Sequence, residues 1–336
     1  LGERLRTARQ KLLDTTIEDL MDLIDRLSAR WLDVDSPVRG ETIPGIVATT
    51  GFSPEMVAHA IDLEHESSRT EHLERAVQQE IGNPLALDQL TVNPYLMGQT
   101  RVVGPEVVGA VFSANIPGLP HLEVMRAFLV KATCLGKVPT GEPVFLGAYA
   151  RTLAEEAPEL AGCLAVIGVD RDDTKARQAF IEVSDYLVAY GGQEAIDSWQ
   201  ADCPHSLRAT WHGHRMGFAV VLRDTLTAEA LTPLAEALAY DFSLFDQEAC
   251  LAPTTLYVET GGDMSPEALA DAIAQGMADQ ARRFPPRDLS MNERATLRHW
   301  LDDRKLDGAS IAKAPKGLPW VVLIDPTPGL IPTPPG

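Results

Sequence analysis

The stretch from Val102 to Gln200 decides the fold class, because short apolar runs alternate in it with segments of helical length. The apolar runs are VVGAVFSA (107–114), TCLGKV (133–138), CLAVIGV (163–169) and DYLVAY (185–190). The helical segments are LEVMRAFLVKA (122–132), EPVFLGAYARTLAEEA (142–157), TKARQAFIEV (174–183) and GGQEAIDSWQ (191–200). Near-continuous apolar strands separated by amphipathic helices predict a parallel β-sheet that is covered on both faces.

The segments on either side of this stretch predict further helices and strands. Apolar residues recur at three-and-four spacing over residues 1–32. Ser53, Pro54 and Glu55 are typical of a helix start, and this helix is expected to run through IDLEHESSRTEHLERAVQQ. The histidines expected on its solvated face are His59, His65 and His72. Beyond the sheet we expect helices over 227–240 and 265–283 and strands over 254–259 and 320–325.

The composition is that of an ordinary globular protein and excludes several classes. With 336 residues, 45% of them hydrophobic, the chain is expected to form about two domains with cores of their own. A formal net charge of −19 disfavours binding to nucleic acid or to an anionic membrane surface. No run reaches the roughly 18 apolar residues of a membrane span. The N-terminal segment lacks the apolar core of a signal peptide, so a cytoplasmic location is expected.

The four cysteines differ in their surroundings. They are too few and too far apart for a disulfide framework or a metal knuckle. Cys134 and Cys163 lie in apolar runs and are expected in the core. Cys250 lies among polar residues ahead of a strand, where a cysteine is either a nucleophile or an inert thiol. Elsewhere, Gly191 and Gly192 precede a helix whose N-terminus can hold a phosphate, although no GxGxxG or GxxxxGK[ST] motif is present.

Four segments occur in the order, and at about the spacing, found in the aldehyde dehydrogenase superfamily. They are FSANIPGLP (112–120), GKVPTGEP (136–143), YGGQEAIDSW (190–199) and FDQEACLAP (245–253). The chain resembles most the acyl-thioester-reducing branch, the fatty acyl-CoA (acyl-protein thioester) reductases of bacterial luminescence systems. The resemblance implies an α/β, aldehyde-dehydrogenase-like fold. Residues 1–222 would form N-terminal helices and a parallel Rossmann-type NADP-binding domain, and residues 223–336 an α/β catalytic domain.

The resemblance also assigns the catalytic groups. It makes Cys250 the nucleophile that attacks the thioester carbonyl and carries the acyl group. Asn115 matches the asparagine whose amide helps to hold the developing oxyanion, although the residues alone indicate only a strand end. The stretch WHGHRMGFAVV (211–221) stands where aldehyde-oxidising members have a water-activating glutamate, and it contains no carboxylate. Its His212 and His214 are either proton relays or structural residues. No third ligand accompanies this pair, so no metal site is expected.

The cofactor follows from the second matching segment. Lys137 matches the superfamily lysine near the adenosine ribose. Three residues later, NAD-preferring relatives have a glutamate that binds the ribose hydroxyls, and this chain has Thr140. A small hydroxyl leaves room for a 2′-phosphate, so we expect NADPH, with NADH less favoured, although Glu142 counts against this choice. The turn that approaches the cofactor pyrophosphate is matched by Gly191, Gly192 and Gln193.

The sequence therefore predicts an NADPH-dependent reductase that converts a fatty acyl thioester to a fatty aldehyde. The expected partner is an acyl-CoA or acyl-carrier thioester. An acyltransferase or synthetase partner and a homo-oligomer are both compatible with the resemblance. Two alternatives stay open: an aldehyde-oxidising dehydrogenase of the same fold, and a catalytically silent scaffold subunit of a multienzyme complex. Few residues follow Cys250 by comparison with the family, which indicates a truncated or small catalytic domain.

Overall fold

The computed structural model describes residues 1–313, 320–326 and 329. They form two compact units, one made of Leu1–Thr50 and Val57–His214, the other of Gly51–Met56 and the described residues from Arg215 onward. The units divide shortly before the boundary that the sequence suggests after residue 222. The reason is that strand β8 (Gly217–Val221) pairs with strand β9 (Pro253–Val258) of the second unit.

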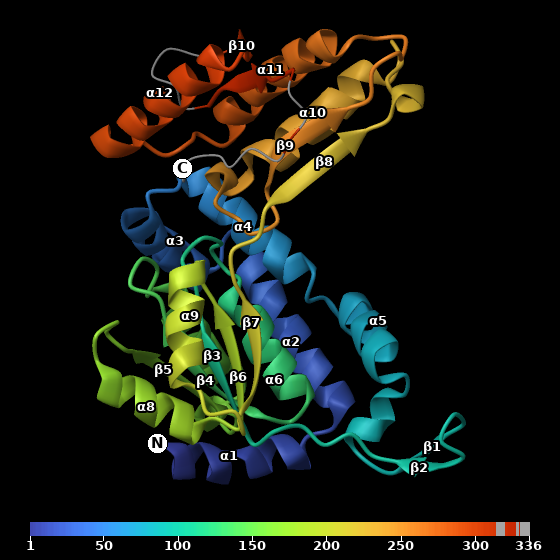
Figure 1. Cartoon of the computed structure of the whole chain (residues 1–336). Helices are drawn as coiled ribbons and strands as arrows, with labels where there is room; N and C mark the ends of the chain where they lie inside the picture. Colours follow the sequence, from blue (N-terminus) through green and yellow to red (C-terminus); the bar gives the residue numbers. More distant parts are fainter. Residues whose placement is uncertain (314–319, 327–328, 330–336) are drawn as a thin grey trace. The chain divides into compact units, whose positions relative to one another are not determined.

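A five-stranded parallel sheet forms the centre of the first unit (Figure 1). Its strands are β3 (Val107–Val111), β4 (Thr133–Val138), β5 (Leu164–Gly168), β6 (Tyr186–Tyr190) and β7 (Arg208–His212). They stand in the order β5-β4-β3-β6-β7, and every pair is parallel, which confirms the predicted sheet. The order reverses between β3 and β6. In open α/β sheets, ligands bind at such a point, outside the carboxyl ends of the strands.

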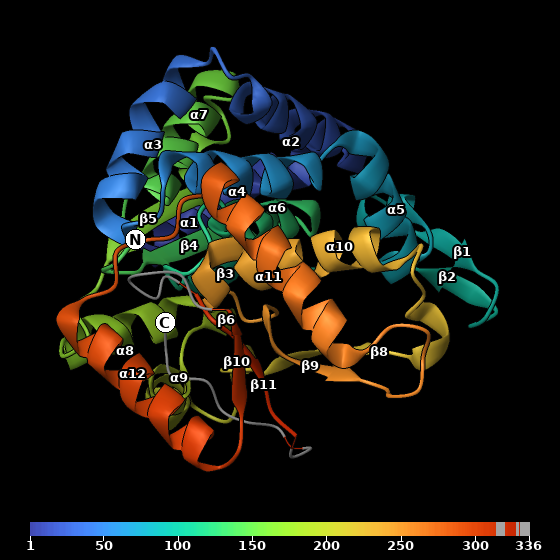
Figure 2. The ribbon, with the colours of Figure 1, turned by 90° about the horizontal axis from the view of Figure 1, so that it is seen from above.

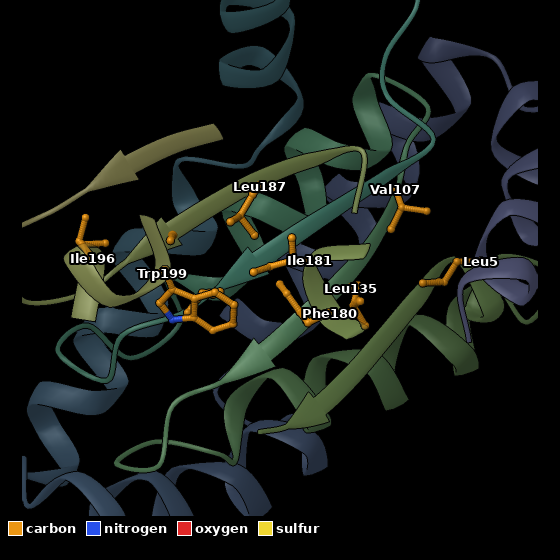
Figure 3. Packing of buried hydrophobic residues seen from close by; sticks show 10 residues of the cluster. Leu5, Val107, Leu135, Phe180, Ile181, Leu187, Ile196 and Trp199 are labelled. Carbon is orange, nitrogen blue, oxygen red and sulfur yellow. The ribbon is translucent and has the colours of Figure 1, made fainter. Parts of the chain in front are cut away.

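Helices cover both faces of this sheet (Figure 2). One face carries α8 (Thr174–Val183) and α9 (Gln193–Asp202), and the other carries α6 (Pro120–Leu129) and α7 (Phe145–Glu156). Under α8 and α9, the ring of Phe180 meets that of Trp199 edge to face and both pack toward Leu187 (Figure 3). Gly109 of β3 has to be glycine, because a Cβ there would lie 2.1 Å from Ser184 Oγ at the end of α8.

Five helices precede the sheet. They are α1 (Gly2–Asp14), α2 (Ile17–Leu32), α3 (Pro37–Thr50), α4 (Pro54–Glu66) and α5 (Thr70–Ile81). The predicted start of α4 is confirmed, since the Ser53 hydroxyl accepts the Met56 N–H at 3.1 Å. The prediction of one continuous helix beyond Glu66 is wrong. The carboxylate of Asp25 in α2 accepts the Thr70 N–H at 2.9 Å, and this bond starts a new helix.

His65 corrects a second expectation, because it is buried rather than solvated. Its side chain is 0% exposed and stacks between Trp31, at a centroid distance of 5.6 Å, and His121, at 4.1 Å. Burial, together with the charges of His121 and Arg39 nearby, holds the pKa of His65 well below its usual value. Of the other two histidines, His59 is half-buried and His72 is exposed.

A short antiparallel hairpin, β1 (Thr91–Asn93) and β2 (Gly98–Thr100), leads from the N-terminal helices to β3 and has no counterpart in the sequence prediction. It projects from the first unit in both views (Figures 1 and 2). Its tip is apolar and open to solvent, with Tyr95 94% and Met97 93% exposed. The 3₁₀ turns of the chain are η1 (Pro84–Leu87), η2 (Ala161–Cys163), η3 (Arg223–Thr225) and η4 (Leu244–Gln247).

The second unit packs the parallel pair β8–β9 against α10 (Leu231–Ser243) and α11 (Pro266–Arg283). Helix α11 lies within the predicted 265–283 segment, and Ser265 caps it by accepting the Ala268 N–H. Helix α12 (Met291–Leu306) follows, and then β10 (Ser310–Lys313) pairs antiparallel with β11 (Val322–Ile324), the predicted last strand. Within the described ranges, no helix is long and apolar enough to cross a membrane.

Candidate active site

A pocket of about 280 Å³ opens at the carboxyl ends of β3, β4, β5 and β6, where the strand order reverses. Its charged and polar lining consists of Ser113, Lys137, Thr140, Asp170, Arg171, Arg177, Tyr190 and Ser198, and its apolar lining includes Gly191 and Trp199. Three cations therefore face one carboxylate there, in a chain whose formal net charge is −19. Two of these cations are also ion-paired, Arg171 with Glu194 at 2.5 Å and Arg177 with Asp202 at 2.6 Å, which reduces the positive charge that the pocket presents to an anionic ligand.

Lys137 is the penultimate residue of β4 and lines this pocket. Burial, and then the charge of Arg177, lower the pKa of its ammonium group. Within the described part of the chain, no carboxylate forms an ion pair with Lys137. The charge of Asp170, which lines the same pocket, acts in the opposite sense and raises the pKa of Lys137.

Thr140 and Glu142 turn in different directions from the loop after β4. Thr140 is exposed and lines the pocket. Glu142 is only 3% exposed, and its carboxylate accepts the Val144 N–H at 2.8 Å and the Phe145 N–H at 2.9 Å. Glu142 therefore caps α7 and does not line the pocket. The Glu142 carboxylate, which counted against NADPH in the sequence, is thus occupied by backbone hydrogen bonds at the start of α7.

Arg177 is a pocket residue that the sequence analysis missed. Its guanidinium lies 4.8 Å from the centre of the Trp199 ring and is 9% exposed as a side chain. The terminal nitrogens donate to Ser198, to the Arg171 carbonyl and to Asp202, whereas the buried Nε finds no acceptor. An arginine spaced along a helix gives no sequence signal for such a role, because its direction depends on how α8 packs against α9.

The turn before α9 brings the backbone close to the same pocket. Gly191 lines it, and Gly192 is the N-cap of α9. A Cβ at Gly192 would meet nothing within 4 Å, so the fold itself leaves this position open. Gln193 does not line the pocket, since its side-chain amide donates to Asp197 one turn further along α9 at 2.7 Å. The free N–H groups of the α9 N-terminus suit a phosphate.

The loop after β3 carries Asn115 on a fixed backbone. Ser113 Oγ donates to Asn115 Oδ1 at 2.6 Å. Further along, Gly118 has φ +89°, a left-handed conformation that favours glycine. Its carbonyl accepts from His121 Nδ1 at 2.9 Å, while His121 Nε2 lies 2.8 Å from Ser68 Oγ. Burial lowers the pKa of His121 to about 4, so this anchor is a neutral imidazole.

Glu64 lies beside the same loop and is a further residue that the sequence did not single out. Its Cβ and Cγ approach within 3.5 Å of the place where a Gly118 Cβ would be. Burial raises the pKa of Glu64 to about 7, and the charge of Arg126 only partly opposes this. Glu64 therefore titrates near neutral pH, which residue type alone does not indicate.

His212, at the end of β7, is held by aromatic stacking. Its ring lies 4.5 Å from that of Tyr190 at an interplanar angle of 9°. The Tyr190 ring also stacks with that of Phe112, at a centroid distance of 6.5 Å. The Tyr190 hydroxyl donates to Glu123 Oε1 at 2.5 Å. His214 is exposed and follows β7. No three His, Cys, Asp or Glu side chains gather as metal ligands in the described residues.

Cys250 belongs to the second unit, in an exposed turn just before β9. Cys134 and Cys163 are buried, as expected. The turn before Cys250 is strained, because Phe245, Asp246 and Gln247 have φ of 54°, 49° and 64°. Non-glycine residues adopt this left-handed region at a cost of about 1–2 kcal/mol each. Strain of this kind is concentrated at functional sites.

The chain that follows Cys250 runs tightly against β8. A Cβ on Gly217 would lie 2.6 Å from the carbonyl oxygen of Ala252 and 2.9 Å from that of Leu251. Gly217 is therefore required for the Cys250 turn to close onto the strand pair. Of the predicted site residues, Lys137, Thr140 and Gly191 share one pocket. Asn115, in the loop after β3, and His212, at the end of β7, belong to the same unit, with β6 between their strands, and Cys250 belongs to the other unit.

The strand order and the solved counterparts place the chain among the aldehyde-dehydrogenase-like α/β proteins. The putative aldehyde dehydrogenase PutA from Anabaena variabilis superposes with a TM-score of 0.66 at 15% identity, over 96% of this chain and 67% of that one. The glyceraldehyde-3-phosphate dehydrogenase GapN from Methanocaldococcus jannaschii, complexed with NADP, superposes with a TM-score of 0.65 at 11% identity, over 94% and 68%. At these identities the likeness shows the fold alone, and it confirms the predicted fold class.

The family follows from the sequence comparison. The model of the acyl-CoA reductase (LuxC) family matches residues 12–334, so the chain belongs to this family. The long-chain acyl-protein thioester reductase of Photobacterium phosphoreum is 22% identical over 288 residues, which are 84% of this chain and 57% of that protein. The chain thus spans about half the length of the curated relatives it matches.

Proposed function

We propose that the protein reduces a fatty acyl thioester to a fatty aldehyde with NADPH, through an acyl group carried on Cys250. Membership in the acyl-CoA reductase family supports the reaction class. The observation that carries the proposal is the pocket at the switch point of the sheet, which joins Lys137 and Thr140 to the turn at Gly191.

The charges and spacing of this pocket fit a dinucleotide with a 2′-phosphate. Strands β6 and β4 are two places apart in the sheet, or roughly 10 Å. A pyrophosphate at the α9 N-terminus would therefore leave the adenosine ribose near Lys137. There Lys137 and Arg177 supply positive charge, Thr140 leaves space, and Glu142 is turned away. An NAD-selective site would present a carboxylate to the ribose hydroxyls at the position of Thr140; the carboxylate of this lining is Asp170, in the segment after β5.

The acylation half of the reaction is assigned to the loop cysteine. The Cys250 thiolate would form a bond to the thioester carbonyl carbon, and the bond from that carbon to the sulfur of CoA or a carrier would break, releasing the donor as a thiol. The Asn115 amide is oriented by Ser113 and can donate to the oxyanion that develops. Residues 211–221 contain no carboxylate to activate water, which favours reduction of the acyl group over its hydrolysis.

The second half of the reaction, in which the acyl group is reduced, needs a hydride and a proton. A bound nicotinamide would supply the hydride to the acyl carbon. The resulting hemithioacetal on Cys250 then collapses, the carbon–sulfur bond breaks and the aldehyde leaves. His212, fixed against Tyr190, is the group we assign to proton exchange with the oxyanion, and His214 is the alternative. The acyl donor, an acyltransferase or synthetase partner, a homo-oligomer and a cytoplasmic location stay predictions.

The acyl-enzyme can be tested by intact mass. The protein is incubated with a long-chain acyl-CoA without NADPH, beside a Cys250→Ala variant. We expect the mass to rise by one acyl group in the wild type alone, and the label to leave as aldehyde when NADPH is added. If the folded wild type gains no mass with any of several chain lengths, the proposed function is wrong and a silent subunit is the better reading.

The cofactor preference can be tested by binding. We expect NADPH to bind more tightly than NADH. The Arg177→Gln substitution should weaken NADPH binding about tenfold and change NADH binding less than threefold, because the charge it removes would contact the 2′-phosphate that only NADPH carries. Lys175→Gln is the matched control, because it removes the same charge from an exposed position of α8. Equal weakening of both cofactors by Arg177→Gln would contradict a role in selecting the phosphate.

A further inference from the structure

The segment that leads to Cys250 makes two hydrogen bonds with Arg287, a residue of the linker between α11 and α12, besides the local bonds of the turn itself. Arg287 donates its backbone N–H to Asp246 Oδ2 at 3.1 Å. Its side-chain Nε donates to Glu248 Oε1 at 3.0 Å. Asp246 belongs to the strained turn and Glu248 follows it, so the backbone and the side chain of Arg287 hold the segment before Cys250 together.

Arg287 is itself fixed. Its side chain is 14% exposed, and its Nη2 also donates to Glu293 Oε1 at 2.8 Å. Glu293 completes the capping box of α12 with Ser290, whose backbone N–H it accepts at 2.6 Å. The contacts of Arg287 with the Cys250 segment are therefore fixed by its bond to the capped N-terminus of α12.

The same contacts balance charge close to the thiol. Asp246 and Glu248 precede Cys250 by four and two residues, and two residues span at most about 7 Å of chain. The backbones of Glu248 and Cys250 therefore lie within about 7 Å of each other. Burial raises the pKa of both carboxyls, and the Arg287 charge lowers it in both. An unbalanced carboxylate here would oppose formation of a thiolate.

We infer that Arg287 is a positioning residue for Cys250: it holds the left-handed turn and neutralises the two carboxylates before the cysteine, and so sets the direction and reactivity of the thiol. This inference rests on the proposed function in that Cys250 is the nucleophile. It adds a residue that contacts no substrate and that stands far from Cys250 in the sequence.

The test measures the thiol itself, without acyl-CoA or cofactor. Alkylation of Cys250 by iodoacetamide is followed by peptide mass against pH, with the half-buried Cys203 of the first unit as an internal reference. We expect Arg287→Gln to slow alkylation of Cys250 at pH 7.5 about tenfold, because the segment that carries the thiol loses its fixed direction, with Cys203 unchanged. Adding Glu248→Gln should restore part of the rate. Arg298→Gln, an exposed change of the same charge on α12, should leave Cys250 as in the wild type.

The outcomes separate the two proposals. A folded Arg287→Gln protein with an unaltered Cys250 alkylation rate overturns the inference, and so does a loss of rate that Cys203 shares. If this variant does not fold, Arg287→Lys keeps the charge and is expected to lose less than threefold, and a tenfold loss there would overturn the charge argument. Failure of wild-type acylation by acyl-CoA, with normal alkylation, would instead count against the proposed function.

Discussion

His121 and His65 are titratable groups that the first unit keeps neutral, and each packs its ring against the other. Burial takes the pKa of His121 from 6.5 to about 4. The unfolded chain therefore binds a proton below pH 6.5 that the folded chain does not bind until about pH 4. Stability from this residue is complete above pH 6.5 and is lost as the pH falls toward 4.

We expect the first unit to lose about 2 kcal/mol between pH 7 and pH 5 from His121 alone. Urea unfolding at these two pH values measures the change. The variant His121→Gln should show a smaller pH dependence, whereas His72→Gln, at an exposed position, should keep that of the wild type. An unchanged slope in His121→Gln would show that the imidazole ionises freely in the fold.

Glu64 predicts the opposite pH dependence. Its pKa is raised from 4.5 to about 7, so its contribution to stability is full below pH 4.5 and is lost as the pH rises through 7. Glu64→Gln should then stabilise the protein at pH 8, by at most about 3 kcal/mol, and not at pH 5. Thermal melts at both pH values are the measurement. Destabilisation at pH 8 would show that attraction to Arg126 outweighs burial.

At the scale of elements, two glycines predict opposite effects of one methyl group. Gly109→Ala in β3 would place Cβ 2.1 Å from Ser184 Oγ and is expected to cost about 1–3 kcal/mol. Gly147, inside α7, has nothing within 4 Å of its Cβ position, so Gly147→Ala should stabilise by about 0.5–1 kcal/mol. Denaturant midpoints of the two variants decide the matter. A tolerated Gly109→Ala would mean that α8 can move away from the sheet.

The strands and helices of the sheet domain were predictable because they bury their apolar residues locally. TCLGKV and TKARQAFIEV coincide with β4 and α8 residue for residue. The break between α4 and α5 was not predictable, since Asp25, distant in sequence, supplies the cap. Helix α3 contains Pro44, which argues against a helix in sequence, and it still forms in the structure.

The candidate site likewise contains residues that the sequence predicts and residues that it does not. Lys137 and Thr140 were predicted from the resemblance, and Gly191 also from its place before a helix; the structure brings all three to one pocket because parallel strands end at one edge of the sheet. Cys250 was found through a resemblance, with its polar neighbours as support. Arg177 and Arg287 were missed, because each acts through a packing contact made by another helix or linker. His65 was placed on the wrong side of its helix, since a histidine gives no reliable polarity signal.

The whole molecule has two units with separate cores, one around the parallel sheet and one around β8, β9, α10 and α11. A ligand that binds one unit stabilises that unit, by about 2.7 kcal/mol at a hundred times its dissociation constant. We expect NADPH to slow hydrogen exchange in β4, β6 and α9 and to leave α10 and α11 unchanged. Peptide-resolved exchange measures this. Equal protection of both units would contradict a cofactor site confined to the first.

Trp199 gives the pocket a built-in optical reporter. Its indole lines the cavity, is 7% exposed and lies under the Arg177 guanidinium. A ligand that enters the pocket changes the polarity and the quenching groups around one defined fluorophore among the five tryptophans of the chain. Emission of the unlabelled protein should therefore respond to NADPH, and Trp199→Phe should abolish that response. Occupancy of the pocket can then be followed in real time, before any product forms.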